Sequence, residues 1–205
     1  MKFAPNYFPR PGSTYSPNPG IFWAMDKNQL KEFYEWFMSS LPYCLEELMQ
    51  LVVGTPGFED WNADDSPDSL NGLGDWFAMQ VETRELSQDE LQAIKATLIS
   101  PIEIQTWTLT DETKSLALYV GMYYGEVAIK NNPLLKWEQS VQMAGKKKMV
   151  DYGQPVVAGG NFVPTNPVRV AHVFANGIAS GGQTGRRLRE VYESRAKLVM
   201  AVSKN

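Results

Sequence analysis

The segment from Thr110 to Lys130 constrains the fold of this chain most, because it predicts a long helix with a closely packed face. Thr110 is suited to cap the start, acidic residues fill the first turn, and Lys130 lies in the last turn, as the helix dipole favours. Small residues recur four positions apart on one face, namely Ala117, Gly121 and Gly125. Each mid-helix glycine costs about 1 kcal/mol relative to alanine. We therefore expect a neighbouring helix or sheet to pack against this face, with a ligand groove as the alternative.

Capping and breaking residues predict further helices on both sides of this one. Two capping boxes and an Asn-Pro pair predict helix starts: Asp26 with Gln29, Ser87 with Glu90, and Asn166 with Pro167. Pro42 is expected to end one helix and open the next, because proline lacks the backbone N–H that a helix interior needs. The expected helices cover residues 26–41, 43–53, 67–82, 88–99, 167–180 and 184–202.

Short β-strands are expected between the helices. Residues 102–109, 134–141 and 154–158 show strand patterns, and a turn with Gly145 and three lysines separates the last two. The chain is thus predicted to be α+β, mostly α-helical, with a small antiparallel β-sheet in the C-terminal half. Residues 1–22 are expected to form an extended, proline-rich arm, and residues 23–205 a single globular domain. Aromatic residues should hold the arm to the body: Phe3, Tyr7, Phe8 and Tyr15.

Composition excludes several classes of protein. One cysteine, Cys44, cannot form an internal disulfide and is expected to be buried, and one histidine cannot complete a Cys/His zinc site. No stretch approaches the roughly 20 apolar residues of a membrane span, and the N-terminus lacks the apolar run of a signal peptide. We expect a cytoplasmic protein without a cofactor, metal or membrane association.

Charge is divided between the two ends of the chain. Residues 140–205 hold ten basic and three acidic residues, a net charge of +7, whereas residues 1–139 hold nine basic and twenty acidic residues, a net charge of −11. Lys146, Lys147 and Lys148 are expected at a hairpin tip, where they keep a strand edge soluble or contact phosphates. The chain contains no recognised DNA- or RNA-binding motif beside this charge, so nucleic acid is an unlikely partner.

The acidic stretch from residue 58 to 75 is the strongest candidate for a partner-binding surface. Its carboxylates repel one another, and a basic partner would turn that repulsion into attraction. A solvated loop whose acids cap helices is the plainer alternative. The candidate partner-binding residues are Glu59, Asp60, Trp61, Asp64, Asp65, Asp68, Asp75 and Trp76.

The same stretch partly matches a calcium-binding loop. Asp60, Asn62 and Asp64 occupy the first three ligand positions. The match then fails, because Asp65 stands where a glycine is needed and Asn71 where a bidentate glutamate should close the site. Calcium therefore remains a weaker alternative.

Catalysis is not indicated by any motif, since the sequence lacks a P-loop, a Rossmann fingerprint and a nucleophile elbow. His172 is expected to be a partly buried, hydrogen-bonded histidine. An enzyme with a groove near Glu126 and His172 is the alternative, since a general base needs a second group brought close by the fold. The Gly-rich segment 181–185 predicts a turn between helices, or a phosphate cradle at a helix start.

One resemblance suggests a function. Gly125-Glu126-Val127, then Lys136-Trp137 and Gly153-Gln154-Pro155-Val156, resembles a pattern in bacterial immunity-type proteins encoded beside secreted antibacterial toxins. The similarity covers residues 116–157, about a fifth of the chain, and implies no catalytic residue. It implies a protein that binds and neutralises a cognate toxin, such as a basic toxin domain. An enzyme of unknown reaction and a nucleic-acid-associated accessory protein remain the alternatives, and the oligomeric state is left open.

Overall fold

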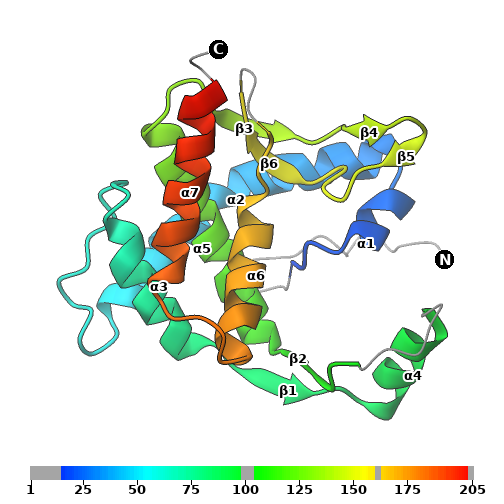
Figure 1. Cartoon of the computed structure of the whole chain (residues 1–205), viewed down its shortest axis with the longest axis horizontal. Coiled ribbons are helices and arrows are strands. Elements are labelled where there is room, and N and C mark those ends of the chain that lie inside the picture. The colour runs from blue at the N-terminus through cyan, green and yellow to red at the C-terminus, as the bar shows by residue number, and fades with distance from the viewer. Residues whose placement is uncertain (1–14, 98–103, 160–162, 203–205) are drawn as a thin grey trace.

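Helix α5 (Asp111–Lys130) runs through the middle of the molecule, and the other long helices pack around it (Figure 1). The computed structural model describes residues 15–97, 104–159 and 163–202, with side chains through residue 96 in the first range and 197 in the last. The predicted cap is confirmed, because the Thr113 N–H donates to Thr110 Oγ1 at 3.2 Å. Both ends of α5 thus agree with the sequence.

Four helices surround α5 and supply the hydrophobic core. Helix α6 makes the most extensive contact with α5, while α3 touches α5, α6 and α7. Aromatic rings fill the space between these helices, as where Phe77 and Phe174 stack with centroids 5.8 Å apart. The four helices are α2 (Lys27–Val53), α3 (Ser69–Gln80), α6 (Pro167–Ala179) and α7 (Arg187–Val202).

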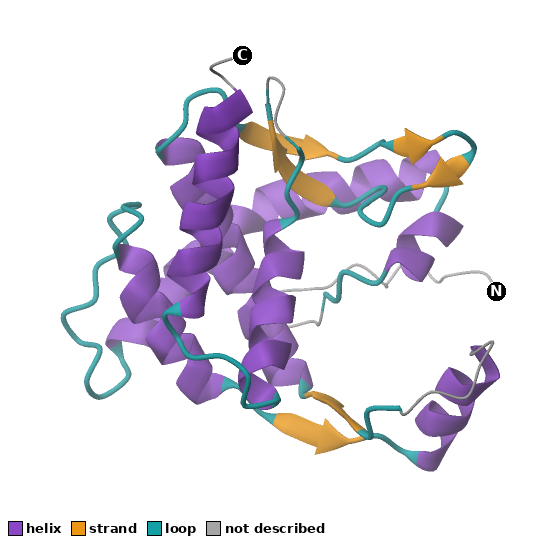
Figure 2. Cartoon of the chain, viewed as in Figure 1, coloured by secondary structure: helices purple, strands orange, loops and turns teal. Residues whose placement is uncertain are grey.

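The strands of the described segments form two-stranded antiparallel sheets at the margins of the helical body (Figure 2). The sheet nearest the core pairs β3 with β6 and places Trp137 opposite Val157. The prediction of an α+β, mostly helical chain with small antiparallel sheets is confirmed. The pairs are β1 (Thr83–Glu85) with β2 (Trp107–Leu109), β3 (Lys136–Gln139) with β6 (Pro155–Ala158), and β4 (Met143–Ala144) with β5 (Lys147–Lys148).

The first described residues differ from the extended arm that the sequence predicts. Helix α1 (Pro19–Ala24) begins inside the expected arm and crosses its boundary at residue 22, with the Asn18 side chain accepting from the Gly20 N–H at 3.0 Å. Tyr15 is buried against Phe22 and Phe33, as its aromatic character predicts. The other aromatic residues of the arm, Phe3, Tyr7 and Phe8, lie outside the described residues.

Pro42 does not end a helix, and that prediction was wrong. Helix α2 continues through it as one element of 27 residues. The apolar face explains why, because Phe37 and Leu41 before the proline and Cys44 and Leu48 after it all lie buried in the same core. Their burial outweighs the cost of a missing backbone hydrogen bond, and Pro42 itself is exposed.

Helix α4 (Gln88–Thr97) stands at the end of the β1–β2 ribbon, away from the helical body in Figure 1. Its capping box is confirmed, since Ser87 Oγ accepts from the Glu90 N–H at 3.2 Å and Glu90 Oε2 accepts from the Ser87 N–H at 2.8 Å. The sequence did not predict strand β1, because its three residues are all exposed and so show no alternation of polar and apolar side chains. Of the strand expected at 102–109, residues 107–109 are extended, and residues 102 and 103 lie outside the described residues.

Candidate functional site

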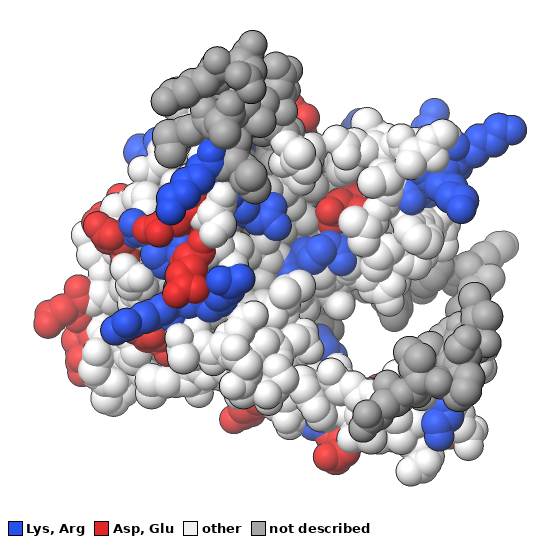
Figure 3. Space-filling model, in the orientation of Figure 1, with Lys and Arg blue, Asp and Glu red and all other residues white. Residues whose placement is uncertain are grey.

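The candidate surface is the loop between α2 and α3, which carries most of the predicted acidic residues. Glu59, Asp60 and Asp64 are exposed, and Asp65 is half-buried. Figure 3 shows acidic side chains at the left edge of the molecule, where Figure 1 places this loop. We call Glu59, Asp60, Asp64 and Asp65 the acidic loop surface.

Residues of helix α5 and its C-terminal cap support the acidic loop through a ring contact and hydrogen bonds. The Trp61 ring packs edge-on against Tyr123 with centroids 5.6 Å apart, and Trp61 Nε1 donates to the Ser69 carbonyl at 3.0 Å. The Asp65 N–H donates to the Tyr123 hydroxyl at 3.2 Å, and Asn131 Nδ2 donates to the Asp65 carbonyl at 2.7 Å. Trp61 is therefore a structural anchor of the loop as well as a half-buried neighbour of its acids.

Two of the acids shape the loop locally. Asp65 adopts a left-handed backbone conformation with φ of 57°, which asparagine and aspartate tolerate better than most residues. Asp64 Oδ1 accepts from the Ser66 N–H at 2.8 Å, and hydrogen bonds from the Ser66 side chain and backbone lower the pKa of the Asp64 carboxyl. Part of the acidity of this stretch therefore serves turn geometry, as the plainer alternative expects.

Two of the predicted partner-binding residues lie elsewhere. Trp76 is only 2% exposed, and its Nε1 donates to Thr55 Oγ1 at 2.9 Å, so this tryptophan is a core residue and not a surface anchor. That prediction was wrong because helical spacing turns Trp76 inward with the buried face of α3. Asp75 is exposed but lies beside the turn before α7, since a Cβ on Gly185 would come within 2.6 Å of the Asp75 nitrogen.

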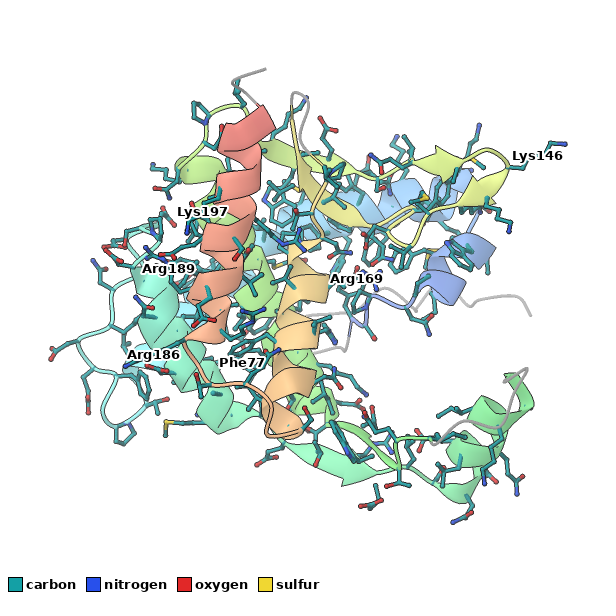
Figure 4. The ribbon with its side chains drawn as sticks, in the orientation of Figure 1. Phe77, Lys146, Arg169, Arg186, Arg189 and Lys197 are labelled. Carbon is teal, nitrogen blue, oxygen red and sulfur yellow. The ribbon has the colours of Figure 1, made fainter. Side chains whose placement is uncertain are left out.

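The two oppositely charged parts of the sequence meet in space. Arg189 of α7 donates to Asp68 Oδ1 at 2.7 Å and to Glu193 Oε1 at 2.9 Å. Figure 4 shows Arg189 and Lys197 on α7 and Arg186 just before it, and Figure 3 shows acidic side chains among basic ones over that helix. Asp68 thus marks the boundary where the acidic loop surface gives way to a mixed one.

The basic residues of the C-terminal third occupy separate regions. In Figure 4, Lys146 lies at the tip of the β4–β5 hairpin, far from the arginines of α7. Lys148 turns back toward the body, where its Nζ donates to the Trp23 carbonyl at 2.8 Å and lies 4.7 Å from the centre of the Tyr152 ring. The lysines form the hairpin that the sequence predicts, but they do not join the α7 arginines in one stripe.

The small-residue face of α5 is a packing surface. A Cβ added to Gly121 would lie 2.6 Å from the Val168 Cα, because the start of α6 crosses α5 there. A Cβ added to Gly125 would overlap the Trp137 ring. The expected close contact is confirmed, and it takes the place of the ligand groove that was the alternative.

Glu126 and His172 do not converge. Glu126 Oε1 accepts from Trp137 Nε1 at 2.7 Å. Gly121 abuts Val168, and the Lys114 charge acts on His172, so α5 and α6 run antiparallel. Glu126 and His172 therefore lie on opposite sides of the Gly121–Val168 contact. At 1.5 Å per residue they are separated by roughly 13 Å along the helix axes.

His172 is buried, with 8% of its surface exposed, and it hydrogen-bonds to the Tyr15 backbone. Its Nε2 has no hydrogen-bond partner among the described residues. Burial, with smaller contributions from the nearby Lys114 and Arg169 charges, lowers the pKa of His172 to about 4. The histidine therefore stays neutral in the folded protein at pH values where an exposed histidine is charged.

The lowered pKa of His172 predicts that the folded protein loses stability in acid. Between pH 6.5 and about 4 the unfolded chain binds a proton that the folded chain does not, so stability is complete above pH 6.5 and falls as the pH drops toward 4. The expected loss is about 2–3 kcal/mol. Urea unfolding from pH 7 to 4.5 measures it, with His172→Gln as the control that should lose most of the dependence. An equal fall in both proteins would contradict this role of His172.

The structure also bears on the Gly-rich segment and on a metal site, the two remaining alternatives from the sequence. The segment 181–185 is a turn between α6 and α7, and Gly185 is buried against α3. Within the described residues, no three His, Cys, Asp or Glu side chains lie together as a metal site would require. Cys44 is buried as expected, and burial raises the pKa of its thiol to about 11.

No helix in the described segments has the length and apolar character needed to cross a membrane. Comparison of the chain with models of known families, with curated proteins and with solved structures finds no match. Only the geometry of the acidic loop surface therefore bears on its function.

Proposed function

We propose that this chain is a binding protein whose acidic loop surface captures a basic protein partner. The observation that supports this most is the combination of exposed carboxylates with a rigid support. Glu59, Asp60 and Asp64 face solvent, while Trp61 and the hydrogen bonds that the Asp65 backbone makes with Tyr123 and Asn131 fix the loop that carries them. A pre-ordered loop pays little entropy on binding, and clustered charge speeds the encounter with an oppositely charged surface.

Immunity against a cognate bacterial toxin is the specific form of this function that we propose, in the cytoplasm. A basic toxin domain, such as a nuclease, has the charge that the acidic loop surface complements. The resemblance of residues 116–157 to immunity-type proteins is consistent with this proposal.

The structure favours the alternatives less. An enzyme with a groove near Glu126 and His172 needs both groups at one place, and they are separated by roughly 13 Å along the helix axes. A nucleic-acid-associated protein needs a continuous basic surface, whereas Lys146 and the α7 arginines lie apart and α7 carries acidic residues among its basic ones.

A triple variant tests the acidic loop surface. Asp60→Asn, Asp64→Asn and Asp65→Asn remove three charges and keep the shape of the loop, because asparagine tolerates the conformation of residue 65 and retains the oxygen that accepts from Ser66. We expect an unchanged melting temperature, since exposed charges contribute little stability. We expect the variant to lose the basic protein that the wild-type chain captures from a lysate of the native host at low salt.

A matched control distinguishes an effect of the acidic loop surface on capture from an effect of net charge alone. Glu32→Gln, Glu46→Gln and Glu85→Gln remove the same charge from exposed positions outside the loop. This control should capture the partner as the wild type does. Equal capture by the wild type and the loop variant, or equal loss in both triple variants, would contradict the proposed role of the loop.

A further inference from the structure

A second site lies at the opposite end of α5 from His172, in a cavity of about 250 Å³. Helix α5 forms one wall and helix α7 another, and residues 163–167 close a third side. We call this the α5–α7 cavity. Its apolar lining comes from Ala128, Leu135, Val157, Val163, Pro167 and Ala196.

The α5–α7 cavity contains a polar group that the fold leaves without a partner. Tyr124 lines the cavity and is only 2% exposed, yet its hydroxyl makes no hydrogen bond within the described residues. A buried hydroxyl without a partner costs free energy, so native proteins seldom retain one without a use. Burial raises the pKa of Tyr124, so the hydroxyl keeps its proton and can donate a hydrogen bond.

Aromatic rings, one cation, and the polar residues Asn131, Asn132 and Thr165 also line the cavity. The Tyr192 ring packs edge-on against Tyr124 with centroids 5.9 Å apart. Arg195 lines the same cavity from the exposed side of α7, where its Nη1 donates to Thr165 Oγ1 at 2.8 Å. No described carboxylate forms an ion pair with Arg195, which distinguishes it from Arg169, Arg187 and Arg189.

We propose that the α5–α7 cavity binds a small aromatic carboxylate, with the ring system packed against the joined Tyr124 and Tyr192 rings and the carboxylate paired with Arg195. Offset or edge-on contact with two tyrosine rings favours an aromatic ligand over an aliphatic one. Arginine presents a planar fork of donors that matches a carboxylate. The Tyr124 oxygen is inaccessible to solvent, so its hydroxyl gains the partner it lacks only when the ring turns enough for the O–H to reach a ligand oxygen.

Size limits the ligand to one or two rings. A dry protein cavity of about 150 Å³ holds benzene, and the α5–α7 cavity is larger at about 250 Å³. A fused two-ring acid therefore suits it. This small-molecule site goes beyond the proposed capture of a protein partner, because it shares none of the four acidic loop residues.

Calorimetric titration of the full chain with 2-naphthoate tests the proposal. We expect 2-naphthoate to bind, with its neutral amide and octanoate each binding at least tenfold more weakly. Arg195→Gln should weaken 2-naphthoate binding at least tenfold, because a charge-assisted contact is lost. Arg186 is exposed and lies just before α7, outside the cavity lining. Arg186→Gln should therefore leave binding unchanged, and it controls for the loss of one positive charge.

Two substitutions within the cavity locate the ligand. Tyr124→Phe should fold at least as well as the wild type, since it removes an unpaired hydroxyl, and should weaken binding several-fold. Ala128→Phe should abolish binding by filling the cavity, and thermal melts verify that it folds. Lack of binding at millimolar 2-naphthoate would overturn the proposal, as would wild-type affinity in Arg195→Gln or in folded Ala128→Phe. Equal affinity for octanoate would refute the aromatic class.

Discussion

Gly121→Leu is expected to lower the free energy of unfolding by about 3 kcal/mol or more, a large part of the stability of a typical domain. The first carbon of the new side chain would lie 2.6 Å from the Val168 Cα and 2.8 Å from its nitrogen. Both atoms belong to the backbone of α6, so no side-chain rotation relieves the clash. Helix α6 must move away from α5, and this is the most extensive contact between helices in the molecule.

Circular dichroism melts of Gly121→Leu measure this effect. Gly182→Leu is the matched control, because a Cβ at residue 182 meets its nearest atom at 3.7 Å and residue 182 lies in the turn after α6. The control should melt close to the wild type. Equal melting temperatures for the two variants would mean that α5 and α6 do not pack at Gly121.

Gln154→Leu is expected to cost about 3–4 kcal/mol of stability, although leucine is more hydrophobic than glutamine. Gln154 is fully buried and joins three parts of the chain. Its Oε1 accepts from the Tyr15 hydroxyl and from Asn166 Nδ2, each at 2.9 Å, and its Nε2 donates to the Val150 carbonyl at 3.2 Å. Leucine leaves the Tyr15 hydroxyl buried and unpaired.

A double-mutant cycle checks this explanation by urea unfolding. Tyr15→Phe removes the hydroxyl that Gln154→Leu would leave without a partner. The double variant should therefore be more stable than the sum of the two single effects predicts, by about 1–2 kcal/mol. Strictly additive losses would show that the Tyr15 and Gln154 side chains do not interact.

Local chemistry made much of the secondary structure predictable. The caps at Asp26, Ser87, Thr110 and Asn166 act within three residues of themselves, so the sequence alone identifies them, and each makes its expected hydrogen bond. The glycines of α5 likewise predict a close neighbour. What the sequence could not supply is the identity of that neighbour, because Val168 lies 47 positions away.

The errors arise where tertiary contacts override local preference. Pro42 breaks helices in isolation, but a buried face on both sides carries α2 through it. Trp76 stands in an acidic stretch yet belongs to the core of α3. Tyr123 and Asn131, which hold the acidic loop, gave no sequence signal for that role, since their contacts with Asp65 span 58 and 66 residues.

The α5–α7 cavity was equally hidden from the sequence. Its lining residues come from α5, α7, the start of α6 and three separate strand or loop segments, and no spacing rule unites them. The four-residue interval between Tyr124 and Ala128 only places both on one face of α5. The unpaired hydroxyl of Tyr124 and the Arg195 guanidinium, which lacks an ion pair among the described residues, become visible as a site only in three dimensions.

The most direct test of the acidic loop surface is the rate at which the chain associates with the basic partner that it captures. Association should be measured on an immobilised surface at low and at high salt, for the wild type and the Asp60, Asp64 and Asp65 triple variant. We predict that salt slows the wild type steeply, because it screens the attraction, and that the variant associates slowly with little salt dependence. Equal rates for the two proteins at both salt concentrations would contradict the account.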